Sequence, residues 1–322
     1  MVKIPDTKTH EFLNAAGWGN ATGDPITGDA SARKYFRLHR GNQTSILMDA
    51  SQNLESVAPY VLINRHLQQL DFSVPAILAQ DEKSGFLLLE DFGDATFARL
   101  LEDAGDADKL YTLATDVLIA LHQNSQAIPT GLRAYHPEKM LADIELFLEW
   151  CTPTISRVGR DEFQTVWREV LPLAHRIPAS LLLRDYHVAN LMFLPDREGV
   201  RRAALLDFQD AYQGPITYDL VSLLEDARRD VADDLRANML SRYLARSPAL
   251  DRTAFETSLA ILAALRHTRV LAIFERLSRH EGKRNYKKLH SPRVERLLQR
   301  ALIHPVLAGV KRWMERYVAF KK

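Results

Sequence analysis

Residues 181–194 read LLLRDYHVANLMFL, in which two apolar runs flank a short run of polar residues. Both apolar runs have the length and composition of buried strands. The seven residues from Arg184 to Asn190 that separate them are mostly polar, so the chain must leave one strand and enter the next through a polar loop. This stretch therefore constrains the fold and the chemistry of the chain more than any other.

The second apolar run continues into a predicted β-hairpin. Strand-like residues 190–194 and 202–207 flank the segment PDREGV, whose proline, aspartate and glycine favour a turn. If that turn is centred between residues 198 and 199, Asn190 lies directly opposite Asp207 at the base of the hairpin. Asp185 precedes Asn190 by five positions, so a short loop keeps it near the same strand ends. The sequence thus predicts three oxygen-bearing side chains at one point.

Such a set of side chains favours phosphoryl transfer. Carboxylate and amide oxygens suit Mg²⁺, which prefers one or two carboxylates together with the phosphates of a substrate. A carboxylate left free of the metal could accept the proton of a hydroxyl. Each residue also has a purely structural interpretation, as a turn cap, a loop hydrogen bond or the end of a strand.

The rest of the chain divides into a strand-rich part and a mostly helical part, as its length of 322 residues favours. In the first part the spacing of apolar residues predicts helices at 7–16 and 55–70 and strands at 33–40, 44–49 and 85–90. The second part has further strands at 180–183 and in the hairpin, and predicted helices at 94–104, 108–124, 137–151, 160–175, 217–228, 231–245, 251–279 and 291–319, the last broken near Pro305. We expect an α+β chain with an N-lobe of residues 1–93 and a C-lobe of residues 94–322.

Composition restricts the partners and the compartment. Lys and Arg number 42 and Asp and Glu 41, which argues against a dedicated nucleic-acid or membrane binder and favours a small-molecule partner. The single cysteine, Cys151, is expected to be a core residue rather than a nucleophile. The chain shows neither a signal peptide nor a membrane span, so a cytoplasmic location is expected. The sequence does not fix the oligomeric state, and a monomer is compatible with it.

The spacing of the polar cluster resembles that of the protein-kinase-like superfamily. The D-x-x-x-x-N spacing from Asp185 to Asn190, followed by a strand that ends in DFQ at Asp207, is similar to its catalytic set, and in particular to the aminoglycoside phosphotransferase family. The resemblance implies a two-lobed fold with a small strand-rich N-lobe and a larger, mostly helical C-lobe. It also implies that the cofactors are ATP and Mg²⁺. Asn190 and Asp207 would then hold Mg²⁺ and the nucleotide phosphates, and Asp185 would orient the accepting hydroxyl.

The same resemblance implies two nucleotide-binding segments in the N-lobe. In TGDASARKYFRL (27–38), a turn would cover the phosphates with its backbone N–H groups, and its residues are Gly28, Asp29, Ala30 and Ser31. In FLLLEDFGD (86–94), the main chain of Glu90, Asp91 and Phe92 would contact adenine.

One departure from the general kinase pattern concerns a lysine. The strand TSILMDAS (44–51) lacks the phosphate-pairing lysine expected there. Arg33 or Lys34, on the neighbouring strand, is the expected replacement, because side chains alternate along a strand and one of the two faces the site. The sequence leaves open which of them it is.

Longer stretches narrow the resemblance to a family of bacterial anomeric kinases that act on N-acetylmuramate and N-acetylglucosamine. The stretches are GDASARKYFRL, LLLEDFGD, LRDYHVANLM, LLDFQDAYQGPITYDLVSLL and LRHTRVLAIFERLSRHEGKRNY, and the likeness runs from about Gly28 to the C-terminal helices. It implies transfer of the ATP γ-phosphate to the C1 hydroxyl, giving a sugar 1-phosphate for peptidoglycan recycling. It also makes the absent lysine a family trait.

Residues that flank the catalytic loop are the expected sugar contacts, and they are Tyr186, His187, Gln209 and Asp210. His187 either hydrogen-bonds a sugar hydroxyl or braces the loop. Arg266, on a predicted helix, either binds the lactyl carboxylate of N-acetylmuramate or packs against another helix. Asp219 is expected to hydrogen-bond the backbone near the catalytic loop, and the basic segment 282–288 to be a solvated loop.

Two alternatives stay open at this point. The acceptor could be an aminoglycoside or another small alcohol, in which case acidic residues should line the acceptor pocket. The chain could also be a nucleotide-binding pseudokinase that serves as a sensor or scaffold.

Overall fold

A computed structural model of the chain describes residues 7–26, 33–280 and 284–318. Packing divides the chain into two compact units, one of residues 1–113 and 188–211, the other of residues 114–187 and 212–322. This division differs from the predicted boundary after residue 93. It does so because the hairpin packs onto the strand-rich part through isolated β-bridges that join Thr96 to Met192 and Ser73 to Ala204.

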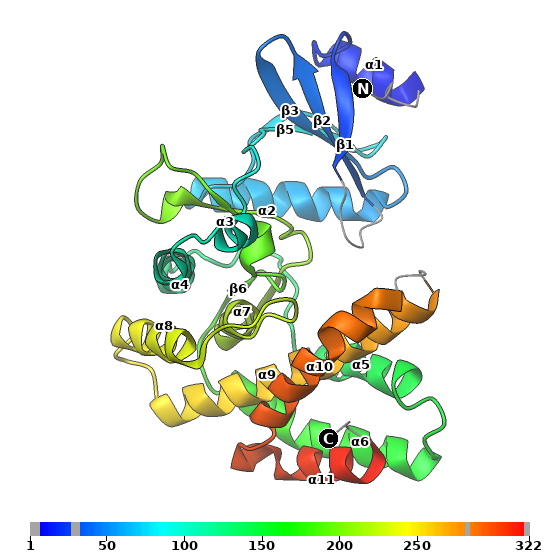
Figure 1. The fold of residues 1–322 in the computed structure, drawn as a ribbon, viewed down its shortest axis with the longest axis vertical. Coiled ribbons are helices and arrows are strands. Elements are labelled where there is room, and N and C mark those ends of the chain that lie inside the picture. Colours follow the sequence, from blue (N-terminus) through cyan, green and yellow to red (C-terminus); the bar gives the residue numbers. More distant parts are fainter. Residues whose placement is uncertain (1–6, 27–32, 281–283, 319–322) are drawn as a thin grey trace. The chain divides into compact units, whose positions relative to one another are not determined.

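The first unit is built on a five-stranded antiparallel sheet of order β1-β2-β3-β5-β4 (Figure 1). Its strands are β1 (Thr22–Ile26), β2 (Lys34–Arg40), β3 (Gln43–Asp49), β4 (Ile77–Asp81) and β5 (Phe86–Leu89). Helix α1 (Thr7–Ala15) packs against this sheet, with Phe12 and Leu13 buried among Leu47, Phe86 and Leu88. The other elements before the hairpin are the 3-10 turn η1 (Leu54–Ser56), α2 (Val57–Gln69) and α3 (Phe97–Glu102).

Most of the predicted elements of the first unit are confirmed, but its two edge strands were not predicted. β1 reads TGDPI, and its residues are mostly exposed, so no apolar alternation marks it. Pro25 is compatible with a strand there because an edge strand need not donate every N–H. β4 lies at the other edge and alternates between half-buried and exposed residues. Main-chain pairing with β2 and β5, rather than side-chain pattern, defines these two strands.

The hairpin is confirmed, but its register differs by one residue from the prediction. It consists of η3 (Val188–Asn190), β7 (Leu191–Phe193), η4 (Gly199–Arg202) and β8 (Ala203–Leu205). Leu191 faces Leu205, and the N–H of Leu206 donates to the carbonyl of Asn190 at 3.0 Å. Asn190 is therefore opposite Leu206 rather than Asp207. The turn centre that we assumed, between residues 198 and 199, is wrong, because the pairing of Leu191 with Leu205 and of Leu194 with Arg202 centres the loop on Glu198.

The second unit is mostly helical. Helix α4 (Ala107–Gln123) begins in the first unit and continues into the second. The other elements of the second unit are α5 (Pro137–Trp150), α6 (Arg157–Val170), η2 (Leu171–His175), β6 (Ala179–Leu182), β9 (Tyr212–Pro215), α7 (Thr217–Leu224), α8 (Asp233–Ala245), α9 (Arg252–His280), α10 (Arg284–Ala301), η5 (Pro305–Leu307) and α11 (Ala308–Tyr317). The unpredicted β9 pairs with β6 in an antiparallel ribbon. Strand β6 of this ribbon leads into the predicted catalytic loop, which carries Asp185.

Helix α9 forms the centre of the second unit. It packs against α5, α7 and α10 and lies side by side with α10 in Figure 1. By length and composition it could cross a membrane, but 78% of its apolar window is buried inside the protein, as in a core helix. Burial raises the pKa of Cys151 to about 12, which keeps this half-buried side chain a thiol and agrees with the expected structural role.

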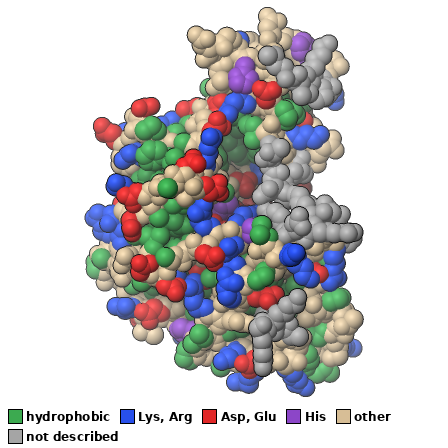
Figure 2. All heavy atoms as spheres, in the orientation of Figure 1, with side chains coloured by type: hydrophobic (Ala, Val, Ile, Leu, Met, Phe, Trp, Pro, Cys, Tyr) green, Lys and Arg blue, Asp and Glu red, His purple; other side chains and the backbone are tan. Residues whose placement is uncertain are grey.

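The C-terminal helices differ from the prediction at one point. The basic segment 282–288 was expected to be a loop, but residues from Arg284 onward begin α10. Pro292 lies inside this helix, where the sequence suggested a helix start, and Lys287 forms an ion pair with Glu275 of α9 at 2.5 Å. The predicted break near Pro305 is confirmed. On the face shown in Figure 2, Lys and Arg alternate with Asp and Glu, in keeping with the formal net charge of +1.

Candidate active site

Asp207 is the best-defined polar residue of the first unit. It lies two residues after the end of β8 and has a positive φ of 58°, an uncommon conformation for a residue with a side chain, which turns the chain away from the strand. Its Oδ1 atom accepts hydrogen bonds from Arg33 at 2.7 Å and from Gln209 at 3.1 Å. The next residue, Phe208, stacks on Tyr60 with ring centroids 5.0 Å apart. The carboxylate is thus held in place from several sides and is still 41% exposed.

The sequence left open whether Arg33 or Lys34 lies beside the site, and in the structure Arg33 is the one that contacts Asp207. Its side chain is only 7% exposed and forms an ion pair with Asp207, whereas Lys34 is exposed to solvent. Lys34 is the first residue of β2 and Arg33 immediately precedes it, and side chains of neighbouring residues in extended backbone point to opposite faces. On the adjacent strand β3, Met48 is fully buried. In the first unit, the cation beside the predicted metal ligand is therefore an arginine.

The donors at the hairpin base fit a magnesium ion rather than an all-protein metal cage. Asn190 and Asp207 offer amide and carboxylate oxygens, the hard ligands that Mg²⁺ prefers, and the backbone bond between Leu206 and Asn190 fixes the hairpin base that carries both residues. Among the described residues there is no group of three or more His, Cys, Asp or Glu side chains that could hold a metal. Mg²⁺ commonly binds with one or two protein ligands and takes the others from water and phosphate.

The predicted adenine segment is partly engaged within the protein. The N–H of Glu90 donates to Ala76 at 2.9 Å, so it is not available to a nucleotide. The Glu90 side chain accepts from the N–H of Ala76 and from Arg197, and the Asp91 side chain pairs with Arg37 at 2.8 Å. The prediction for Glu90 is thus wrong for its N–H group. The backbone groups of Asp91 and Phe92 make no backbone hydrogen bonds outside strands and helices among the described residues.

The predicted phosphate-covering turn cannot be compared with the structure. Gly28, Asp29, Ala30 and Ser31 lie outside the described residues.

In the second unit, Asp219 holds the backbone of the catalytic loop. Asp219, in the first turn of α7, accepts the N–H groups of Leu183 at 2.6 Å and Arg184 at 2.9 Å, and it is almost completely buried. Arg184 has a positive φ of 69°, so the chain turns sharply just before Asp185. The hydroxyl of Ser222 donates to the carbonyl of Arg184 at 3.2 Å. The expected role of Asp219 as a backbone acceptor is confirmed.

Positive charge surrounds Asp185. Burial alone would raise the pKa of this carboxyl, but nearby arginine charges, that of Arg269 first and that of Arg266 after it, hold it below its ordinary value. Asp185 is therefore ionised at neutral pH. Near neutral pH it can accept a hydrogen bond from a hydroxyl.

A carboxylate on α5 connects two of the surrounding arginines. Asp143 accepts a hydrogen bond from Arg184 at 2.8 Å, lies 3.9 Å from Arg269, and also bonds Lys139 and Tyr135. Sequence reasoning missed Asp143 and Arg269. The spacing of Arg266 and Arg269, three residues apart on one helix, indicates a shared face and could have found the second arginine. Nothing in the sequence around Asp143 marks it.

The predicted sugar contacts lie in different surroundings. Tyr186 is buried and its hydroxyl donates to the carbonyl of Ala114 at 2.8 Å, so it braces the loop in place of the predicted contact with the sugar. His187 is also buried, and burial lowers its pKa, which favours the neutral ring. In the first unit, Gln209 is buried beside Asp207, while Asp210 is exposed and accepts from Gln209 at 3.2 Å.

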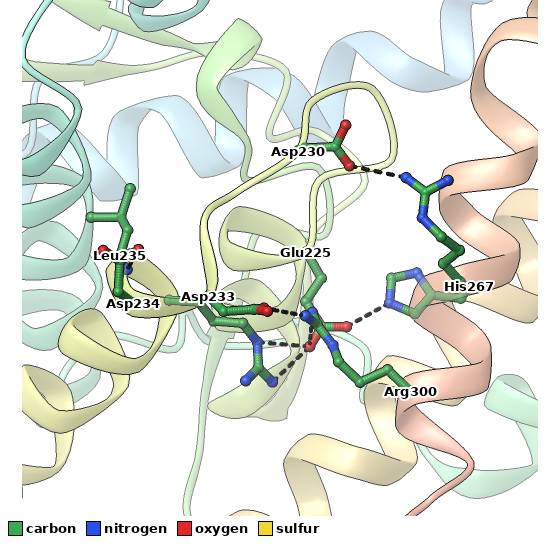
Figure 3. Close-up of polar contacts among 9 residues, drawn as sticks. Glu225, Asp230, Asp233, Asp234, Leu235, His267 and Arg300 are labelled. Carbon is green, nitrogen blue, oxygen red and sulfur yellow. Dashed lines mark hydrogen bonds and ion pairs between the residues drawn. The ribbon is translucent and has the colours of Figure 1, made fainter.

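The described residues also line two cavities, and neither is lined by Asp185, Asn190 or Asp207. One, of about 490 Å³, lies in the first unit and is lined by residues 71–73, 196–198 and 201. The other, of about 320 Å³, lies in the second unit between the segment 224–233 and helix α10. Figure 3 shows the contacts at its wall, where Glu225 accepts from Arg236 at 2.7 Å and from His267 at 2.7 Å and pairs with Arg300 at 3.2 Å.

Comparison with known sequences gives a consistent result. Residues 22–255 match the phosphotransferase enzyme family. Relatives named N-acetylmuramate/N-acetylglucosamine kinase include that of Caulobacter vibrioides, 35% identical over 95% of both chains. That of Pseudomonas putida is 31% identical over 87% of this chain and 85% of its own. That of Neisseria meningitidis is 33% identical over 84% of this chain and 81% of its own.

Solved structures confirm the predicted protein-kinase-like α+β fold class. A choline/ethanolamine kinase family protein from Mesorhizobium loti superimposes with a TM-score of 0.66 at 14% identity, covering 96% of this chain and 98% of its own. The streptomycin-ATP-APH(2")-IIa ternary complex superimposes with a TM-score of 0.60 at 16% identity, covering 83% of this chain and 91% of its own. At these identities the likeness concerns the fold.

Proposed function

Because this chain belongs to the phosphotransferase enzyme family, we propose that it transfers the γ-phosphate of ATP to the anomeric C1 hydroxyl of N-acetylmuramate and N-acetylglucosamine. The observation that carries the proposal is the 35% identity, over 95% of both chains, to the Caulobacter vibrioides relative of that name. The product would be a sugar 1-phosphate. Its reuse would place the enzyme in the recycling of peptidoglycan sugars in the cytoplasm.

Asp185 is the proposed catalytic residue. An anomeric hydroxyl is a weak nucleophile, and phosphoryl transfer needs little more from the protein than alignment and charge stabilisation. An ionised carboxylate that accepts a hydrogen bond from this hydroxyl orients one oxygen lone pair toward the phosphorus atom. The depressed pKa of Asp185 supports this orienting role over that of a strong base.

Asn190 and Asp207 are the proposed ligands of the metal ion that accompanies ATP. When bound, Mg²⁺ would neutralise charge on the transferring phosphates. Arg33 would add a second cation for the phosphates and take the place of the missing strand lysine, because its guanidinium already reaches Asp207. The main chain of Asp91 and Phe92 would contact adenine, and His187, Gln209 and Asp210 would flank the sugar.

The charge around Asp185 disfavours the alternative acceptor. Aminoglycosides carry several positive charges, and a pocket for them should be lined by acids. Three arginines of the second unit, Arg184, Arg266 and Arg269, act on Asp185 instead. A neutral or anionic sugar suits this surface better than a cationic drug.

A product analysis tests the proposal. Purified protein with Mg-ATP should phosphorylate both amino sugars, and ³¹P spectra should show the phosphate coupled to the anomeric proton. Aminoglycosides and other small alcohols serve as competing acceptors in the same assay. Phosphate on another carbon, or turnover of an aminoglycoside with neither amino sugar used, would contradict the assignment. ATP binding without any phosphate transfer would favour a pseudokinase.

A further inference from the structure

Arg266 is a buried cation that forms no direct ion pair among the described residues. Its side chain lies in helix α9, it is only 4% exposed, and its Nη1 atom is fully buried without a hydrogen-bond partner among the described residues. The other two arginines that act on Asp185 differ from it because each has a carboxylate at ion-pair distance. Arg184 and Arg269 both lie next to the carboxylate of Asp143, at 2.8 and 3.9 Å.

A buried arginine without an anion is costly to maintain. The guanidinium stays charged at every physiological pH, so it cannot avoid the cost of burial by losing a proton. Buried charges in folded proteins are paired or hydrogen-bonded for this reason. A guanidinium that has no directly paired carboxylate is completed most simply by an anion that arrives with a ligand.

The position of Arg266 places it at the catalytic loop. Arg266 and Arg269 are three residues apart in α9 and so share one side of the helix. The charges of both hold the pKa of Asp185 below its usual range, and Arg266 also acts on His187. Both arginines therefore lie on the side of α9 that faces the proposed catalytic residue.

The neighbouring residue fixes helix α9 in this orientation. His267 is fully buried and its Nε2 lies 2.7 Å from Glu225, whose carboxylate is itself held by Arg236 and Arg300 (Figure 3). Successive residues of a helix point in different directions, so this contact uses a different side of α9 from the one that carries Arg266. The arginine is thus positioned by contacts that do not neutralise it.

We propose that Arg266 recognises the lactyl carboxylate of N-acetylmuramate in the acceptor site. This inference rests on the proposed function and deepens it, because it assigns the discrimination between the two sugars to one residue. The lactyl group is attached two ring carbons from the reacting C1 hydroxyl, so a cation near Asp185 but distinct from it is suitably placed. A guanidinium can bind a carboxylate through two parallel hydrogen bonds. N-Acetylglucosamine has no such group.

The competing interpretation is that Arg266 serves only as a counter-charge for Asp185. In that case its loss would reduce the turnover of both sugars by the same factor, because both use the same hydroxyl and the same carboxylate. The ratio of the two kcat/KM values separates the two interpretations.

The test combines two enzymes with three acceptors. Arg266→Gln and the wild type are assayed with N-acetylmuramate, its methyl ester and N-acetylglucosamine. We expect the substitution to lower the kcat/KM ratio of N-acetylmuramate to N-acetylglucosamine by about 10- to 100-fold, the usual effect of losing a hydrogen bond to a charged group. Esterification should lower the ratio in the wild type and have little further effect in Arg266→Gln. Arg279→Gln, which removes an arginine paired with Glu275 in the same helix, is the matched control.

The outcomes are distinguishable from a failure of the proposed function. Absence of turnover of all three acceptors by the wild type would refute that function and this inference with it. If the wild type acts on both sugars but Arg266→Gln lowers both kcat/KM values in parallel, the inference fails and the function stands. Should Arg266→Gln not fold, the ester in the wild type decides alone, and equal kcat/KM for acid and ester would overturn the inference.

Discussion

At the scale of single residues, the arrangement around Asp207 explains how the chain manages without a strand lysine. Arg33 is nearly buried and its guanidinium bonds Asp207, so it is already directed at the proposed metal ligand. An arginine can bind phosphate oxygens through several donors in a fixed plane, which a lysine cannot do. The loss of the lysine is thus compatible with a working nucleotide site.

A substitution of Arg33 tests this account. Arg33→Met should lower kcat/KM for ATP by about 10- to 100-fold, mainly through KM, because charge-assisted hydrogen bonds to the phosphates are lost. Lys34→Met, the exposed neighbour on β2, is the matched control and should change kcat/KM far less. Steady-state kinetics with ATP varied provide the measurement. Equal effects of the two substitutions would show that Arg33 does not replace the lysine.

The residues also show how far sequence reasoning extends. It proposed Asp185, Asn190 and Asp207 as site residues from their spacing, and they stay a prediction. It could not choose between Arg33 and Lys34, because alternation predicts two faces without saying which one faces the site. It placed Tyr186 at the sugar, since nothing in the sequence reveals that its hydroxyl reaches Ala114, 72 positions away. Contacts between distant segments are absent from local patterns.

At the scale of elements, helix α7 and the catalytic loop act as one piece. Asp219 in the first turn of α7 accepts two backbone N–H groups just before Asp185, and Ser222 in the same helix bonds the carbonyl of Arg184. Because Arg184 adopts a left-handed conformation, the loop needs such fixed partners to keep its shape.

Removal of the Asp219 carboxylate should therefore destabilise the protein. Asp219→Ala leaves two buried N–H groups unsatisfied, at a cost of about 1–3 kcal/mol each, so the free energy of unfolding should fall by about 2–6 kcal/mol. Ser222→Ala removes one neutral hydrogen bond in the same helix and should cost only about 1 kcal/mol. Urea unfolding of the three proteins gives these values. An Asp219→Ala protein no less stable than Ser222→Ala would contradict the proposed bracing.

Which elements could be predicted follows from their pattern. Strands β2, β3 and β5 and the long amphipathic helices carry strong apolar periodicity and were found. β1, β4 and β9 are short and are defined by main-chain pairing, so they were missed. The one-residue error in the hairpin register came from the assumed turn centre between residues 198 and 199, whereas the loop is centred on Glu198. The start predicted for α10 was late because the basic segment 282–288 was interpreted as a loop, whereas the helix begins at Arg284.

At the scale of the whole molecule, the fold class and family were accessible from sequence, because a few spaced motifs specify both. The sequence did not reveal that the hairpin groups with the strand-rich unit. Residues 188–211 are close in sequence to the helical part, and only non-local bridges, such as that between Ser73 and Ala204, attach them to the first unit.

The measurement that tests the central claim most directly is the turnover and ATP affinity of Asp185→Asn. The amide has nearly the same shape as the carboxylate but lacks its charge, so the substitution should leave ATP binding within about twofold and reduce kcat on the order of a thousandfold. Asp196→Asn, an exposed residue of the hairpin loop, is the control. A kcat for Asp185→Asn equal to that of the control would contradict the account.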